Sequence, residues 1–254
     1  NQFEVEVYEG IVCPGFVNSH CHLELSHMKG LMPTGSGLPK FVSQIPKLRQ
    51  TSKVDKLKSM KEADQNMYKS GIVAVGDISN TTESLSIKKN SAMRYHSFVE
   101  LFGLDKNKAE DLLREGLKTV EEYRSFNLSA CLVPHAPYSL SPQLLEKIYS
   151  NSDDQLLTIH YQETASEKEL FLDSKGDLAE LFIAKGLDLS SQLKSGLNSA
   201  QYALLPYLAK KQKLLLVHNT FSDSTDIEEI ETYFSQAYWC TCPKANWYIE
   251  KQLP

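Results

Sequence analysis

Two apolar runs that end in histidine, LLTIH (residues 156–160) and LLLVH (residues 214–218), are the stretches that decide the fold. Nearly unbroken apolar runs of this length are typical of strands that are covered on both faces in a parallel sheet. Similar runs recur along the chain at Ile11–Val17, Ile72–Asp77, Tyr95–Phe102, Ala130–Pro134 and Ala237–Cys242. We therefore expect seven strands.

Amphipathic stretches separate these runs, with apolar residues at spacings of three and four that predict helices. The predicted helices cover Lys53–Ser70, Lys106–Ser125, Ser141–Tyr149, Ser166–Lys175, Leu178–Lys185, Ser199–Lys210 and Ser224–Phe234, and Gly30–Leu38 reads as a loop. We expect Ser141 and Ser166 to cap the helices that they begin. Alternating strands and helices predict βαβ units whose right-handed crossovers close a sheet or a barrel.

The composition and charge of the chain exclude several classes of protein. The chain has 254 residues, a formal charge of −5, 41% hydrophobic and 23% charged residues, so an ordinary globular protein is expected. No basic surplus points to nucleic acid, and no apolar run is long enough for a membrane helix. The start, NQFEVEVYEG, lacks the basic and apolar regions of a signal peptide, and five cysteines are too few for a disulfide scaffold. We expect a cytoplasmic protein whose cysteines, Cys240 and Cys242 included, pack as small hydrophobes.

Four histidines fall at or just beyond the ends of predicted strands. His20 and His22 lie two residues apart, so extended backbone turns both rings to the same side, toward one cation. His160 is the best third ligand of a zinc or iron site that keeps a position open for water. Glu163 follows three residues later and can move the water's proton, while His218 can orient or polarise the attacking hydroxide.

Each of these residues also has a structural interpretation. A single histidine at a strand end is usually hydrogen-bonded and structural, and this is what we expect of His27 and His96. His135, after the fourth strand, is as consistent with a substrate contact as with a structural role.

Five segments resemble, in order and spacing, the amidohydrolase superfamily, in the branch of cytosine, guanine and adenosyl-type deaminases and chlorohydrolases. They are PGFVNSHCHLELS (14–26), VPHAPYSLS (133–141), LTIHYQETASE (157–167), LLLVHNT (214–220) and CPKANWYIE (242–250). The resemblance implies a TIM-type (β/α)8 barrel. Within the branch, HLELS and GSGLPKFV are similar to deaminases that act on aminodeoxyfutalosine.

The resemblance also implies roles for the site residues. His20, His22 and His160 match metal ligands, Glu163 matches the proton-shuttling acid, and His218 matches the histidine that polarises the substrate. Binuclear members use a carboxylated lysine that Ala130–Tyr138 lacks, so one divalent metal is expected, with zinc the first choice and iron the second. The implied reaction is deamination of an aminated purine nucleoside or a related ring. His135, Tyr138 and Trp247 are candidate substrate contacts, although Tyr138 and Trp247 equally suit a core.

Two departures from the family pattern shape the remaining expectations. The family's strand-eight aspartate and its small β-domain are not found, so we expect residues 1–254 to be one incomplete barrel domain that ends before strand eight, with its metal absent or weakly held. Three functions stay open: the deaminase, a chlorohydrolase or cyclic amide hydrolase with the same site, and a non-catalytic scaffold. The expected partner is a small-molecule substrate, and a homo-oligomer is compatible with the sequence.

Overall fold

The computed structural model describes residues 6–51, 55–152, 156–189, 193 and 196–254, and all of its strand pairs are parallel. One sheet has the order β1 (Phe16–Cys21), β2 (Ile72–Ser79), β3 (Arg94–Leu101) and β4 (Ser129–Pro134). The other has the order β5 (Leu157–Tyr161), β6 (Lys213–His218) and β7 (Gln236–Cys240). The expected parallel α/β architecture of the barrel type is confirmed.

The two sheets meet where β4 ends and β5 runs past it. The backbone N–H of His160 donates to the carbonyl of His135 at 2.9 Å, which ties the sheets together beside the candidate site. Within the described residues no ladder joins β7 to β1. A cavity of about 1040 Å³ lies in this region, lined from both sheets by residues that include Val17, Tyr95, Leu215 and Tyr238.

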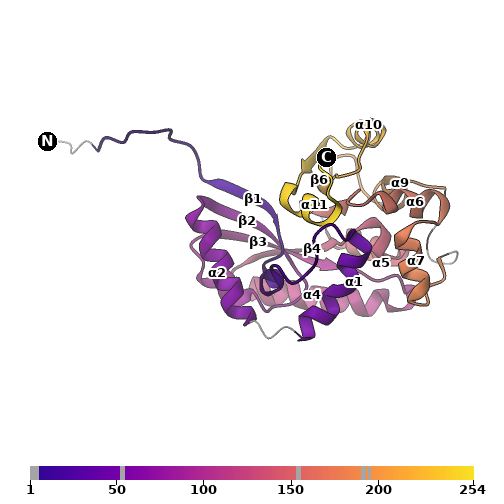
Figure 1. Ribbon diagram of the computed structural model, residues 1–254, viewed down its shortest axis with the longest axis horizontal. Helices are drawn as coiled ribbons and strands as arrows, with labels where there is room; N and C mark the ends of the chain where they lie inside the picture. Colours follow the sequence, from indigo (N-terminus) through magenta and orange to yellow (C-terminus); the bar gives the residue numbers. More distant parts are fainter. Residues whose placement is uncertain (1–5, 52–54, 153–155, 190–192, 194–195) are drawn as a thin grey trace.

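Helices connect successive strands and pack outside the sheets (Figure 1). They are α1 (Leu38–Thr51), α2 (Lys56–Lys69), α3 (Leu85–Asn90), α4 (Ala109–Ser125), α5 (Pro142–Ser150), α6 (Ala165–Asp173), α7 (Asp177–Ala184), α9 (Ser199–Ala203), α10 (Ser224–Tyr233) and α11 (Pro243–Glu250). Short 3-10 turns occur at η1 (Leu23–Met28), η2 (Lys106–Lys108) and η3 (Pro137–Ser139). None of the helices in the described ranges is long and apolar enough to cross a membrane.

The main core lies between the sheets and helices α4 to α10. Helix α4 shows how it forms: Leu113, Val120 and Tyr123 share one face of the helix and are buried. Each such side chain contributes about 1.5–3 kcal/mol by leaving water. Close backbone approach matters between β1 and β2, where a Cβ on Gly76 would lie 2.6 Å from the carbonyl oxygen of Ser19. Glycine at position 76 therefore lets β1, which carries the histidine pair, lie against β2.

Several predicted boundaries were wrong. The first strand runs over Phe16–Cys21 rather than Ile11–Val17, and Ile11 is 95% exposed. Pairing with β2 begins only at Phe16, because Pro14 has no N–H to donate to a ladder. The helix expected over Ser199–Lys210 ends at Ala203, shortly before Pro206. Helices α1, α3 and α11 were not predicted.

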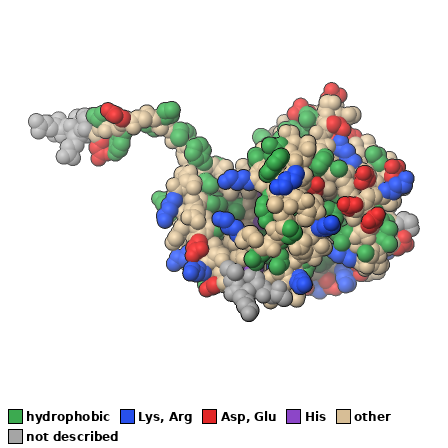
Figure 2. Space-filling view, in the orientation of Figure 1, with side chains coloured by type: hydrophobic (Ala, Val, Ile, Leu, Met, Phe, Trp, Pro, Cys, Tyr) green, Lys and Arg blue, Asp and Glu red, His purple; other side chains and the backbone are tan. Residues whose placement is uncertain are grey.

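Of the two predicted helix caps, one is confirmed and the other is wrong. Ser141 accepts a hydrogen bond from the N–H of Leu144 and caps α5 as expected. Ser166 does not cap α6, whose N-cap is Thr164, and its hydroxyl instead accepts from the N–H of Leu178. On the face seen in Figure 2, Lys and Arg side chains are interspersed with Asp and Glu, and no single basic region dominates.

Candidate active site

Strand β1 places two imidazoles on the same side of the sheet. His20 lies inside the strand and His22 just after it, and their Nε2 atoms are 3.1 Å apart. His160, in β5, brings its Nε2 atom within 3.2 Å of His22 Nε2. Residues 138 positions apart in the chain thus meet at one point, and we call His20, His22 and His160 the histidine triad.

The triad has the donor chemistry that one divalent metal requires. Ligand nitrogens about 2.0–2.1 Å from a tetrahedral zinc lie roughly 3.3 Å from each other, close to the observed spacings. His160 Nδ1 donates to the carbonyl of His135 at 2.8 Å, so the neutral ring presents the lone pair of Nε2 to the triad. Burial lowers the pKa of His22 to about 3 and holds the pKa values of His20 and His160 well below 6.5, which keeps the rings neutral and able to bind a metal.

Glu163 and His218 form a second pair beside the triad. Glu163 follows β5 and His218 ends β6, and Glu163 Oε1 lies 3.4 Å from His218 Nε2. The ring of His218 lies 5.3 Å from that of His160 and 5.6 Å from that of His20, centroid to centroid. Burial raises the pKa of Glu163 to about 8, so its carboxyl group can hold a proton at neutral pH. A buried carboxyl group with such a pKa suits proton transfer.

Asn246, on α11, fixes the orientation of His218. Its side-chain oxygen accepts from His218 Nδ1 at 2.8 Å, and its amide nitrogen donates to the carbonyl of His218 at 3.2 Å. Since an amide oxygen only accepts, Nδ1 carries the proton and Nε2 faces Glu163 with a lone pair. His218 also has φ of +80°, a conformation that costs a non-glycine residue about 1–3 kcal/mol and recurs at functional sites. Burial lowers the pKa of His218 to about 4, so this ring is also neutral at pH 7.

A cavity of about 690 Å³ opens next to the triad and includes His22 in its wall. His135 and Tyr138 line it, with their rings 5.9 Å apart, and their contact with a substrate stays a prediction. Trp247 does not line it: its side chain is 53% exposed on α11, against Lys251, so neither predicted role for Trp247 is met.

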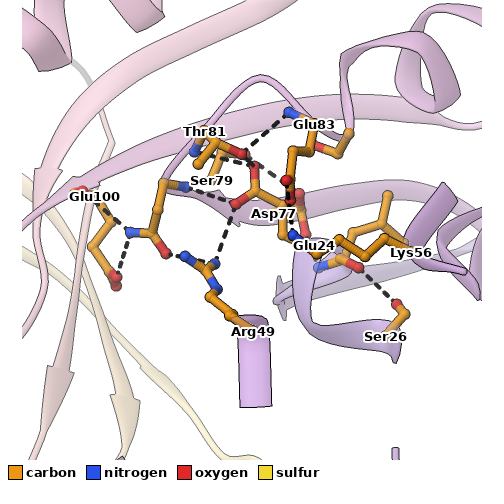
Figure 3. A network of polar contacts seen from close by, with 12 residues as sticks. Glu24, Ser26, Arg49, Lys56, Asp77, Ser79, Thr81, Glu83 and Glu100 are labelled. Atoms are coloured by element: carbon orange, nitrogen blue, oxygen red, sulfur yellow. Dashed lines mark hydrogen bonds and ion pairs between the residues drawn. The ribbon is translucent and has the colours of Figure 1, made fainter. Parts of the chain in front are cut away.

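A network of polar side chains that the sequence analysis missed borders this cavity (Figure 3). Glu24 is buried and accepts from the N–H groups of Asn80 and Thr81 and from Arg49. Asn80 in turn donates to a carboxylate oxygen of Glu100 at 3.0 Å. The available sequence signal was a single acidic residue, Glu100, inside the apolar run Tyr95–Phe102.

A fully buried ion pair lies beside β1, where Asp77 of β2 pairs with Cys21. Lys88 Nζ is 2.7 Å from Asp77 Oδ2, and both side chains have zero exposed surface. Lys88 also donates to the hydroxyls of Ser79 and Ser97. The other oxygen of Asp77 accepts from the N–H of Leu23 at 2.8 Å, one residue after His22. Asp77 thereby anchors the backbone that carries the histidine pair.

The remaining predicted residues lie outside the triad. His27 contacts the carbonyl of Glu24, and His96 contacts Ser129 and Cys131, as befits structural histidines. The expectation that all cysteines pack as buried hydrophobes was wrong, because only Cys131 is buried and Cys13 is exposed. Cys242 lies at the site, where its sulfur is within 4.8 Å of ligand atoms of His20 and His218.

Curated proteins of known activity are similar to this chain in sequence. Adenosine deaminase from Helicobacter pylori is 28% identical over 248 residues, which is 95% of this chain and 59% of that protein. Aminodeoxyfutalosine deaminase from Nitratiruptor is 24% identical and matches 93% of this chain and 57% of its own length. The chain thus spans less than two thirds of the length of these relatives.

Solved structures give the same fold. The crystal structure of Helicobacter pylori aminofutalosine deaminase in complex with methylthio-coformycin superposes with a TM-score of 0.81 at 24% identity, over 94% of this chain and 58% of that one. The model of the amidohydrolase family matches residues 11–254, which include every residue of the site described above. The chain therefore belongs to the amidohydrolase family.

Proposed function

We propose that this protein is a metal-dependent aminohydrolase that removes ammonia from an adenosine-like purine. The observation that carries the proposal is the meeting of three neutral imidazole nitrogens, 3.1 and 3.2 Å apart, beside the buried Glu163–His218 pair. We assign metal binding to the triad, proton transfer to Glu163, and polarisation of the attacked group to His218. The assignment of residues 1–254 to one amidohydrolase barrel domain remains a prediction.

The chemistry divides between the metal and the chain. A bound divalent metal lowers the pKa of water from 15.7 to about 7 and so makes hydroxide available at neutral pH. His160 keeps its ring orientation through the hydrogen bond to the carbonyl of His135. His218, held by Asn246, presents Nε2 toward the same space as Glu163.

Glu163 then carries the proton between the two halves of the reaction. In its ionised form, Glu163 can accept the proton of the water. Because burial raises the pKa of Glu163 to about 8, the carboxyl group can then keep this proton until it gives it to the departing amine. No redox partner is needed: the bond from the water oxygen to the ring carbon forms and the bond from that carbon to the amine nitrogen breaks. One proton of the water leaves with the ammonia, and the other ends on a ring nitrogen of the product. His218 Nε2 can hold the same proton in a hydrogen bond while the substrate repositions.

The substrate class rests on the relatives and on the cavity. The similar proteins are named for adenosine, aminodeoxyfutalosine and 5′-deoxyadenosine, which all contain an aminated purine joined to a sugar. A cavity of about 690 Å³ falls within the roughly 300–1,000 Å³ of small-molecule sites. Aromatic groups of His135 and Tyr138 in its wall suit a flat ring.

Ammonia release from adenosine, 5′-deoxyadenosine and adenine, measured with the zinc-loaded protein, tests the proposal. We expect release from at least one nucleoside, and loss of release in Glu163→Gln with the metal retained. Chloride release from chlorinated triazines, or ring opening of a cyclic amide without ammonia, would instead support the hydrolase alternatives. No turnover of any of these compounds by metal-loaded protein would favour the non-catalytic scaffold.

A further inference from the structure

A cysteine sulfur reaches the site from the start of α11, an element that supplies no member of the triad. The sulfur of Cys242 and one ring nitrogen each of His20 and His218 all lie within 4.8 Å of one another. His20 also belongs to the triad, so the two groups of potential metal ligands share an imidazole. A metal held by the triad is therefore next to a sulfur donor.

The sulfur is positioned by α11 but is not used to cap it. Cys242 is the N-cap residue of this helix, and its side chain makes no capping hydrogen bond. Its carbonyl accepts from the N–H of Asn246 at 2.8 Å, and the side chain of Asn246 holds the ring of His218. The first turn of α11 thus places the sulfur and fixes the His218 ring together. The partial positive charge at a helix N-terminus also favours a thiolate there.

The distances permit a bond between this sulfur and the metal. With zinc–sulfur bonds of about 2.3 Å and zinc–nitrogen bonds of about 2.0–2.1 Å, a tetrahedral site holds its sulfur and nitrogen ligands roughly 3.6 Å apart. The sulfur of Cys242 lies within 4.8 Å of His20, so an approach of at most about 1.2 Å completes the bond. Rotation about χ1 of the cysteine can supply that movement. Since zinc can expand to five ligands, the sulfur does not exclude the water.

We propose that Cys242 binds the metal through its sulfur, as a fourth protein ligand beside the triad. The inference rests on the metal site of the proposed function. A thiolate is a soft ligand that suits zinc, whereas manganese prefers oxygen ligands, so Cys242 would bias the site toward zinc.

Binding of the metal displaces the thiol proton. The hydrogen bond with Cys240, together with burial, raises the pKa of the Cys242 thiol, so the thiol is protonated in the metal-free protein. When the metal binds, the bond from sulfur to hydrogen is replaced by a bond from sulfur to the metal, and the proton passes to the solvent.

Cobalt(II), loaded into the purified chain in place of zinc, tests the proposal. A cobalt–thiolate bond gives a charge-transfer absorption in the near ultraviolet that imidazole ligands do not give. We expect this band in the native protein at one cobalt per chain, and its loss in Cys242→Ser. The same variant should bind zinc at least tenfold more weakly in competition with a chelator, while its affinity for manganese changes less than threefold. Cys240→Ser, which alters the neighbouring thiol, should keep the band and a zinc affinity within threefold of native.

X-ray absorption by the zinc-loaded native protein gives a second measurement that needs no variant. It should show one sulfur about 2.3 Å from the zinc. A zinc shell without sulfur overturns the inference even if Cys242→Ser fails to fold. Loss of the cobalt band in Cys240→Ser but not in Cys242→Ser also overturns it, as do two cobalt ions per chain with the band tied to the second.

The inference and the proposed function can fail separately. A zinc–sulfur bond from Cys242 in a protein that releases no ammonia upholds the inference and refutes the proposed function. Ammonia release by a protein whose zinc has only nitrogen and oxygen ligands does the reverse. A purified chain that binds neither zinc nor cobalt refutes both.

Discussion

Asp77→Asn removes the counter-charge of a buried lysine and should destabilise the protein severely. Asp77 and Lys88 are 2.7 Å apart with no exposed surface, and the Lys88 ammonium would be left with two serine hydroxyls and the faces of Tyr95 and Tyr123. Breaking a buried ion pair on one side costs about 3–5 kcal/mol of unfolding free energy. For a domain of this size, that loss corresponds to a fall in Tm of about 6–20 °C.

Urea and thermal unfolding followed by circular dichroism measure the effect. Glu83→Gln is the matched control, since it removes the partner of Lys56 from a pair whose side chains are 37% and 43% exposed, and should cost at most about 1 kcal/mol. The double variant Asp77→Asn with Lys88→Met keeps an acceptor for the N–H of Leu23 and removes the unpaired charge, so it should recover most of the loss. A single Asp77→Asn variant within 1 kcal/mol of the native protein would refute the reasoning.

Three further predictions follow from the site. Glu163→Gln should retain metal and lose about 10²- to 10⁴-fold in kcat, as measured by metal analysis and ammonia release; near-native turnover would contradict the proton-transfer role. Asn246→Ala should destabilise the protein by about 1–3 kcal/mol in urea unfolding and lower kcat without loss of metal, because it frees the ring of His218; unchanged kcat would show that the ring needs no such support. Metal-free protein should be most stable near pH 6.5 in urea titrations from pH 5 to 8. Below that pH the unfolded chain takes up protons at the four site histidines, because their pKa values in the folded protein are lowered. Above that pH the folded protein is the form that binds more protons, because burial raises the pKa values of Glu163 and of the nearby buried Glu167 to about 8. A steady rise in stability across the whole range would contradict these pKa shifts.

Much of the architecture was accessible from the sequence because parallel strands bury both faces. The runs at 156–160 and 214–218 are apolar except at Thr158 and the two terminal histidines, and the structure has β5 and β6 there within one residue at each end. The first strand was misplaced because the apolar residues Ile11 and Val12 mimic a strand, whereas pairing depends on which backbone groups face β2. The pattern of apolar residues in the sequence does not show which backbone groups pair with β2.

Some residues of the site could likewise be predicted from the sequence, and others could not. The histidines were predictable, since strand ends converge in a parallel fold and histidine is rare enough for its position to carry information. Asn80, Arg49 and Glu100 were not, because their significance comes from a tertiary network that links a helix to two strands. The prediction that Trp247 contacts the substrate was wrong for a related reason. Its neighbours in the sequence belong to the site, but α11 directs Asn246 inward and leaves Trp247 exposed.

Metal stoichiometry of the purified protein and its histidine variants tests the central claim most directly. Zinc-reconstituted native protein should contain one metal per chain by elemental analysis, and alanine substitution at any of His20, His22 or His160 should remove it or weaken its affinity at least tenfold. His96→Ala, which changes a histidine outside the triad, should keep the native stoichiometry and affinity. If all three triad variants bind zinc as tightly as the native protein, the triad does not hold the metal and the proposed chemistry has no basis.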